Sequence, residues 1–296
     1  MPIVPVALSA LAQGLTIAAL GFAFALVYWT TRVFFVALGA IYAVAPFLVM
    51  ELQPHLGVAG AVILTTATAS WLSLVLGWAH HERLLQEKAT DGIHFACSLT
   101  LYFLAAELIV WHWGSDVRSL AGLSGVSEFA AGRSCGLPNS QLAAIGACSG
   151  LVVATFLTLR YSSYGVKLRA MADNPAELAR SGYNPVLLRA IAFLASGLIA
   201  GGASVAVAVD LAVGAHSGLL ALIPAATATL LTPLGRWTRL LTWSLGLGLL
   251  RTLVTFMVSG AWQDPVTMGL LLLALLGRRQ WGWRIRGLRA AFWGAR

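Results

Sequence analysis

The chain has 296 residues, of which 59% are hydrophobic and 10% are charged, and its mean hydropathy is +0.82. Apolar runs close to the roughly 20 residues that cross a bilayer recur along the chain, which predicts a polytopic α-helical membrane protein and excludes a separate soluble domain. The net charge of +8 comes from basic residues beside these runs, a pattern that indicates contact with anionic membrane lipids and argues against binding of nucleic acid.

Hydropathy predicts an all-α transmembrane bundle of eight or nine spans that forms one domain over residues 1–296. The first apolar run continues to Trp29 without a basic segment before it, so we expect a retained span rather than a cleaved signal peptide. The last run is short and suits either a tilted crossing or a re-entrant element. The predicted spans are 6–29, 33–51, 56–79, 92–113, 141–160, 186–209, 217–234, 240–260 and 265–277.

Basic residues predict the orientation of the bundle, because Lys and Arg beside spans are retained on the cytoplasmic side. If the polar stretch 161–185 is cytoplasmic, 16 of the 19 basic residues lie on that side. Arg118 and Arg133 then lie outside, and Arg251 falls within a span. We therefore expect an outside N-terminus and a cytoplasmic C-terminus, with a basic, Trp-rich interfacial tail at 278–296.

Residues 169–185 of the polar stretch read RAMADNPAELARSGYNP. A short helix is predicted to end before Pro175, since proline disfavours the helical conformation of the residue before it. Asn174 is predicted to cap a second helix that begins at Pro175, with Glu177 at the capping-box position and Gly182 at the end. We expect Asn184 and Pro185 to start the next span in the same way, and Met171, Leu178 and Leu187 to anchor the second helix.

This stretch resembles the permease subunits of the branched-chain amino acid type of ABC importer. The family pattern appears as Arg169, Ala170, Met171, Ala172, Asp173, Asn174, Pro175, Ala179, Gly182 and Asn184. The flanks YSSYGVKLRA and LLRAIAFLASGLIAGGASVAVA agree with the family, as does the Glu82–Arg83 pair in HHERLL. The resemblance implies a cytoplasmic coupling loop that docks on an ATPase subunit through Lys167, Arg169, Asp173, Asn174, Pro175, Glu177, Arg180, Gly182 and Asn184.

The resemblance also implies partners and a location. The expected partners are two ATP-binding cassette subunits, a second permease subunit that is identical or homologous, and an extracytoplasmic solute-binding protein. The expected location is a bacterial plasma membrane. ATP and Mg²⁺ are expected on the partner ATPase and no cofactor on this chain, which has no G-x-x-x-x-G-K-[ST] phosphate loop. Cys97, Cys135, Cys148 and the six His are scattered, so we expect neither a metal site nor a disulfide framework.

Two charges lie within predicted spans, Glu107 and Arg251. Either would cost about 2.5–3.5 kcal/mol against lipid, so we expect both to face protein or water beside the translocation path. An anionic group of the solute, or Glu107, is the expected counter-charge of Arg251. The alternatives are that Glu107 extends to the outer interface and that Arg251 forms a structural ion pair.

Phe35 and Gly39 also fall on the expected path, at the position where members of the family carry a polar cluster of Asn, His and Glu. Arg251 aligns where the family carries an acidic residue. Gly197 and Gly201 form a G-x-x-x-G that predicts a close helix crossing, either within the chain or with a second subunit.

The residues and the resemblance together predict a transport subunit rather than an enzyme. It would move a small solute, such as a branched-chain amino acid, urea or an amide, by alternating access driven by a separate ATPase. Two alternatives stay open. One is a scaffold subunit that does not transport, since the polar cluster near Gly39 is missing; the other is an ion-driven secondary transporter, which needs an intramembrane acidic or His relay.

Overall fold

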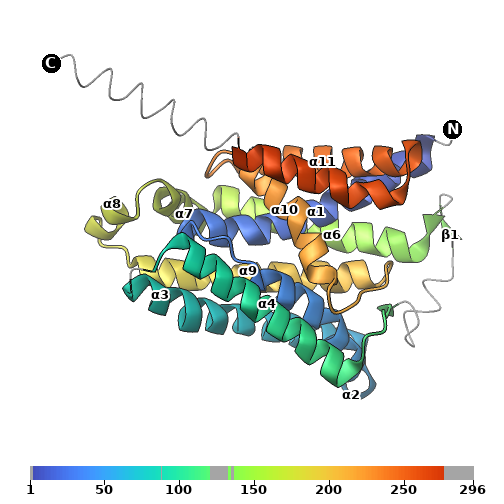
Figure 1. Cartoon of the computed structure of the whole chain (residues 1–296), viewed down its shortest axis with the longest axis horizontal. Coiled ribbons are helices and arrows are strands. Elements are labelled where there is room, and N and C mark those ends of the chain that lie inside the picture. Colours follow the sequence, from blue (N-terminus) through green and yellow to red (C-terminus); the bar gives the residue numbers. More distant parts are fainter. Residues whose placement is uncertain (1–2, 88, 121–132, 135–136, 277–296) are drawn as a thin grey trace, which may run out of the picture.

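The computed structural model describes residues 3–87, 89–120, 133–134 and 137–276, and long helices dominate this part of the chain. They pack side by side, with the short helices α7 and α8 at one end of the bundle and β1 near the other (Figure 1). The predicted interfacial tail 278–296 and Cys135 lie outside the described residues. The long helices are α1 (Ile3–Thr31), α2 (Ala37–Leu76), α4 (Asp91–Trp113), α6 (Asn139–Tyr161), α9 (Pro185–Ala208), α10 (Ser217–Leu231) and α11 (Trp237–Met257).

Shorter elements join the long helices. A π-helix at Gly77–Glu82 and α3 (Arg83–Gln86) follow α2, and α7 (Ser163–Asp173) and α8 (Pro175–Arg180) precede α9. The only described sheet is a two-stranded antiparallel one, β1 (Arg133–Ser134) and β2 (Leu137–Pro138), in which Arg133 pairs with Pro138. A further apolar helix at Gly260–Leu276 begins with a 3₁₀ turn and follows α11.

Six described helices are long and apolar enough to cross a membrane, namely α1, α4, α6, α9, α11 and the long element that contains α2. Two further apolar helices, α10 and Gly260–Leu276, are shorter. All nine predicted apolar runs fall mainly in these eight helices, because α2 holds most of two of them, 33–51 and 56–79. The all-helical class is therefore confirmed, whereas the number of crossings stays a prediction.

The element α2 consists of two helices that join at Gly57. Gly57 has φ 68° and ψ 173°, a conformation that only glycine adopts readily. A methyl group added at Gly201 of α9 would lie 2.7 Å from the Ala69 Cβ and 4.0 Å from the Ala45 Cβ, so both halves of α2 pass beside the same residue. In a straight helix Ala45 and Ala69 would be about 36 Å apart. The chain therefore folds back at Gly57, close to where the sequence predicts a turn between two spans.

Helix α1 forms the centre of the bundle and contacts α6, α9, α10 and α11. Within its most apolar window 78% of the residues are buried, compared with 28% for α4, α6 and α11, which therefore lie at the periphery. Phe22 and Phe24 are fully buried in the core that surrounds α1.

Glycines allow the helices to approach closely, as is usual for helix packing in membranes. A methyl group at Gly248 of α11 would lie 2.3 Å from the Gly14 nitrogen of α1. One at Gly197 would lie 2.4 Å from the carbonyl oxygen of Ala69, and Gly201 meets Ala69 as well. The structure thus places the G-x-x-x-G of α9 against the second half of α2, in a crossing within the chain.

Candidate functional site

The α7–α8 segment, residues 163–184, is held by short-range hydrogen bonds. Helix α7 ends at Asp173, and the Asn174 N–H donates to the Ala170 carbonyl oxygen at 2.9 Å. The Asn174 Oδ1 then accepts from the N–H groups of Ala176 (3.2 Å) and Glu177 (3.3 Å), which caps α8. One asparagine therefore ends α7 and begins α8, and it fixes the angle between the two helices.

The capping box predicted at Glu177 forms only by half. The reciprocal bond, in which the Asn174 N–H would donate to the Glu177 carboxylate, does not form, because that N–H donates to the Ala170 carbonyl oxygen. The Glu177 carboxylate instead accepts from Arg180 Nη1 at 3.2 Å, in a pair that is mostly exposed.

The end of α8 and the start of α9 agree with the prediction. Gly182 has φ 85° and ends α8 in a Schellman motif, in which the Gly182 N–H donates to Ala179 and the Tyr183 N–H donates to Leu178. The Asn184 Oδ1 caps α9 by accepting from the Val186 N–H at 2.9 Å, and Pro185 is the first residue of that helix.

Helix α8 rests on the bundle through one side chain. Leu178 is buried in a small apolar cluster with Met171 and Leu188. The sequence predicts Leu187 in this position, but Leu187 is 59% exposed because it lies about 100° around α9 from the buried Leu188. The other residues of α8 are exposed and include the charged Glu177 and Arg180, so the helix presents a surface that a partner can contact. It lies at the end of the bundle (Figure 1).

Contacts beyond Leu178 fasten the segment to the bundle. The Lys167 ammonium lies 4.7 Å from the centroid of the Tyr183 ring, which joins α7 to the loop before α9. Arg32 lies just after the end of α1, and its guanidinium donates to the Ala172 carbonyl oxygen of α7. Arg32 has φ 63°, which is uncommon for a residue other than glycine. The central helix is therefore tied directly to the α7–α8 segment.

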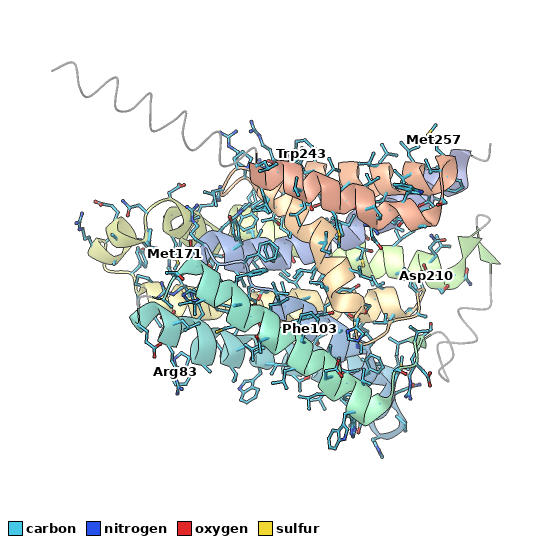
Figure 2. All side chains as sticks on the ribbon, viewed as in Figure 1. Arg83, Phe103, Met171, Asp210, Trp243 and Met257 are labelled. Carbon is cyan, nitrogen blue, oxygen red and sulfur yellow. The ribbon has the colours of Figure 1, made fainter. Side chains whose placement is uncertain are left out.

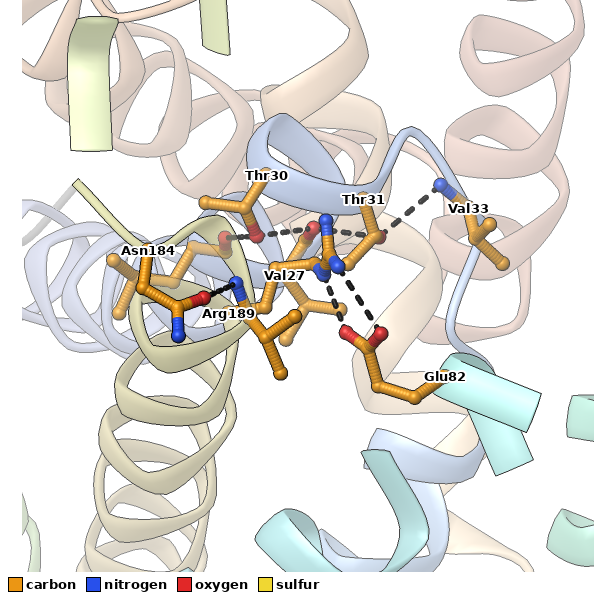
Figure 3. Close-up of polar contacts among 9 residues, drawn as sticks. Val27, Thr30, Thr31, Val33, Glu82, Asn184 and Arg189 are labelled. Carbon is orange, nitrogen blue, oxygen red and sulfur yellow. Dashed lines mark hydrogen bonds and ion pairs between the residues drawn. The ribbon is translucent and has the colours of Figure 1, made fainter. Parts of the chain in front are cut away.

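An ion pair between Glu82 and Arg189 joins the π-helix to α9 at the same end of the bundle (Figure 3). The guanidinium meets the carboxylate with two nitrogens, and the Nη2–Oε2 distance is 3.0 Å. The two side chains are only 14% and 16% exposed, so water screens the pair weakly. Glu82, the first residue of the Glu-Arg motif in HHERLL, therefore forms an ion pair with Arg189 of α9.

A cavity of about 380 Å³ lies between the central helix and its neighbours. Asp210, which lines it, lies near the end of the bundle opposite Met171 and the α7–α8 segment (Figure 2). The volume falls within the range of small-molecule sites. The polar lining residues are Ser9, Gln13, Thr16, Tyr42, Gln141, Asp210, Arg251, Gln263 and Asp264, and the apolar ones include Ile17, Ile145, Val207, Leu220 and Pro224.

Arg251 lines this cavity and is held by three side chains of the following helix. Its Nη1 donates to Thr267 Oγ1 at 2.9 Å, and its Nη2 donates to Gln263 Oε1 at 3.2 Å and to Asp264 Oδ1 at 3.0 Å. The counter-charge is therefore Asp264 and not Glu107, one of the two counter-charges expected from the sequence. Arg251 both forms an ion pair and lines the cavity, so a structural role and a place beside the solute path are compatible for this residue.

The second carboxylate of the cavity, Asp210, follows the end of α9. Its Oδ1 accepts from the Ser140 hydroxyl at 3.1 Å. Among the described residues no salt bridge joins Asp210 to a cation. On α1, the Gln13 Oε1 is buried and has no hydrogen-bond partner within the part of the chain that the structure describes.

The other residues proposed for the path lie away from the cavity. Phe35 is buried with its ring 5.3 Å from the Phe193 ring, and Gly39 packs closely against the Gly218 backbone. Glu107 is exposed on α4. The structure thus brings Arg251 to the cavity, but not Phe35, Gly39 or Glu107.

Sequence reasoning missed Gln13, Ser140, Asp210 and Asp264. The available signal was local: each is a polar residue within or beside an apolar run, as in VAVDLAV and AWQDPV. Only the fold shows that these separate positions surround one space.

Comparison with protein families gives one match. The family model described as branched-chain amino acid transport system / permease component matches residues 5–275, almost the whole chain. A search among curated proteins gives no match.

Proposed function

Since the chain belongs to the permease components of the branched-chain amino acid transport system family, we propose that it carries a small organic solute by alternating access, with the α7–α8 segment as the docking site for the ATPase. Members of this family are multi-pass membrane proteins and are not catalytic, so ATP is hydrolysed by a separate subunit. In this proposal the protein is part of an importer in a bacterial plasma membrane. The complete transporter also contains two ATP-binding cassette subunits, a second permease and an extracytoplasmic solute-binding protein.

The exposed, doubly capped helix α8 is the observation that carries the docking proposal. Leu178 anchors one side of α8, while Asn174, Glu177 and Arg180 are exposed and ordered by local hydrogen bonds. A short helix that is rigid and lies on a surface can transmit a displacement of a partner without melting. The contact from Arg32 to Ala172 and the Glu82–Arg189 pair then connect this displacement to α1 and α9, which line the cavity.

The cavity favours transport over the scaffold alternative. A subunit that only assembles a complex has no need of a cavity between its helices that is lined by two carboxylates, a guanidinium and several amides. The ion-driven alternative needs a chain of intramembrane acidic or His groups. Among the described residues that line the cavity, the acidic ones are Asp210, beyond the end of α9, and Asp264, which is paired with Arg251, and none is a histidine.

The docking proposal is tested with the double variant Asn174→Ala, Glu177→Lys in a reconstituted complex with the ATP-binding cassette subunit. Loss of the cap weakens α8 by about 0.5–2 kcal/mol, and the substitution places a positive charge where the helix dipole favours a negative one. We expect subunit association, stimulated ATP hydrolysis and solute transport to fall together.

Glu51→Lys is the matched control, because it reverses an exposed carboxylate on α2, away from α8. It should leave all three measurements unchanged. A double variant that inserts normally and keeps full association and transport would show that α8 is not the docking site.

A further inference from the structure

The charges that line the cavity do not suit an anionic solute. Among the described residues that line the cavity, Arg251 is the only cation, and Asp264 already neutralises it. Asp210 adds a second carboxylate, so the three charged residues together carry a net charge of −1. A carboxylate or phosphate on a solute would therefore meet excess negative charge, which disfavours its binding.

Two acceptors on the described residues that line the cavity have an incomplete set of hydrogen-bond partners. Asp210 receives one described hydrogen bond, from Ser140, and an ionised carboxylate can accept several. The Gln13 Oε1 is buried without any described partner, and a buried acceptor left unsatisfied is costly. Both groups accept hydrogen bonds, so the group that completes them must donate.

Apolar side chains complete the lining. Ile17 and Ile145 lie on α1 and α6, and Pro224 lies on α10. They provide a surface for a short hydrocarbon portion, as most small-molecule sites do. The volume of about 380 Å³ accommodates a solute of a few carbon atoms with one polar head.

We propose that this cavity binds a small solute through an N–H-donating head group, an amine or an amide, held by Asp210 and Gln13, and that it rejects solutes with a free carboxylate. Asp264 is the residue that determines this selectivity, because it pairs with the Arg251 Nη2 and supplies the negative charge that a solute carboxylate would otherwise supply. The proposal rests on the proposed transport function and narrows the class of its solute.

The test compares three ligands with the same four-carbon skeleton, butylamine, butanamide and butanoate. Saturation-transfer NMR on the full-length chain in lipid nanodiscs measures their equilibrium binding and detects weak ligands. We expect the amine and the amide to bind. Butanoate should bind about tenfold more weakly or not at all, a factor typical of losing one hydrogen bond to a charged group. The amine arm reports an ionic contribution of Asp210, and the amide arm reports hydrogen bonding alone.

Two variants make the assignment specific. Asp210→Asn keeps the acceptor for Ser140 but removes the charge, so it should weaken butylamine by about tenfold and change butanamide little. Gln13→Leu should weaken both N–H donors. Asp116→Asn, which removes an exposed carboxylate outside the cavity lining, is the control and should change neither.

Asp264→Asn gives an independent gain of function. It leaves Arg251 without its carboxylate, so we expect butanoate binding to rise about tenfold. Three outcomes would each overturn the proposal. In the unmodified chain, these are butanoate binding as tight as that of butylamine, or no binding of any of the three ligands. In the variants, the outcome is unaltered selectivity in both Asp210→Asn and Asp264→Asn. Binding requires no ATPase, so such failures leave the docking proposal intact, and loss of docking would leave these binding results intact.

Discussion

The helix caps of the α7–α8 segment are formed by hydrogen bonds between residues within five positions of one another, whereas the cavity takes its polar groups from helices far apart in the sequence. Asn174, for example, bonds to Ala170, Ala176 and Glu177. In contrast, the cavity brings together Gln13 and Asp264, from opposite ends of the chain. A local structure stays rigid while its surroundings move, and a space between helices changes shape when the helices slide.

This contrast suits the two tasks that alternating access requires. A docking surface has to keep its shape through the cycle, and a solute site has to open and close. Glycine crossings such as Gly14 with Gly248 keep the backbones of α1 and α11 in contact beside the cavity. No side chains interlock at such a crossing, so the helices that line the cavity can shift relative to each other.

The largest expected difference between the two regions is the side of the membrane they face. Single cysteines at Asn174, which caps α8, and at Asn139, the first residue of α6, should react with a membrane-impermeant thiol reagent from opposite sides. The background lacks Cys97, Cys135 and Cys148. Labelling of both positions from the same side would disprove the predicted orientation, which rests on the distribution of Lys and Arg.

Gly248→Ala should disrupt the packing of α11 against α1 beside the cavity and leave α8 unaffected. The added methyl group would lie 2.3 Å from the Gly14 nitrogen and 2.4 Å from its Cα, and backbone atoms cannot rotate away. We expect a loss of about 3 kcal/mol or more, seen as a lower midpoint of thermal unfolding in detergent and a smaller monodisperse fraction.

Gly246→Ala, two residues earlier in α11, is the matched control, since apart from the backbone of α11 itself no described heavy atom lies within 4 Å of its added methyl group. It should keep or slightly raise the midpoint, because alanine favours the helix by about 0.5–1 kcal/mol. Equal effects of the two substitutions would mean that α1 and α11 do not cross as closely as the structure shows.

The sequence predicts local features of this molecule well and assembled ones poorly. Pro175, Gly182 and Asn184 act where the sequence places them, because caps and turns depend on neighbouring residues. The anchoring residue proved to be Leu188 instead of Leu187, because a one-residue shift on a helix moves a side chain by about 100°.

The cavity could not be found from local patterns. Arg251 stood out because a charge within an apolar run is costly, yet its partner Asp264 looked like an ordinary residue of a polar turn. Glu107 satisfied the same rule and is exposed on α4, away from the cavity. Which intramembrane charges meet depends on the packing of helices, and hydropathy contains no information about that packing.

Substitutions of Arg251 should have effects of intermediate size, and they separate the role of its charge from the role of its planar guanidinium. Arg251→Leu leaves Asp264 without its cation and breaks three hydrogen bonds, so we expect a loss of about 1–3 kcal/mol and reduced solute transport. Arg251→Lys keeps the charge beside Asp264 but loses the planar fork, so transport should change less than in Arg251→Leu while the complex still assembles. Unaltered transport affinity and rate in Arg251→Leu would exclude Arg251 from the solute path.

The smallest expected effect concerns Arg32, which links the two regions by donating to Ala172 from the end of α1. Arg32→Ala removes this bond and keeps an unfavourable positive φ, whereas Arg32→Gly removes the bond but relieves the backbone strain. We expect Arg32→Gly to be more stable than Arg32→Ala by about 1 kcal/mol, and both variants to transport less solute for each ATP hydrolysed, because α1 no longer follows α7. Arg83→Ala is the control: Arg83 is an exposed cation near the same end of the bundle (Figure 2), and its side chain makes no hydrogen bond in the described part of the chain. A transport-to-hydrolysis ratio that is normal in Arg32→Ala and Arg32→Gly would mean that the movement of α8 reaches the cavity by another route, through the Glu82–Arg189 pair and α9.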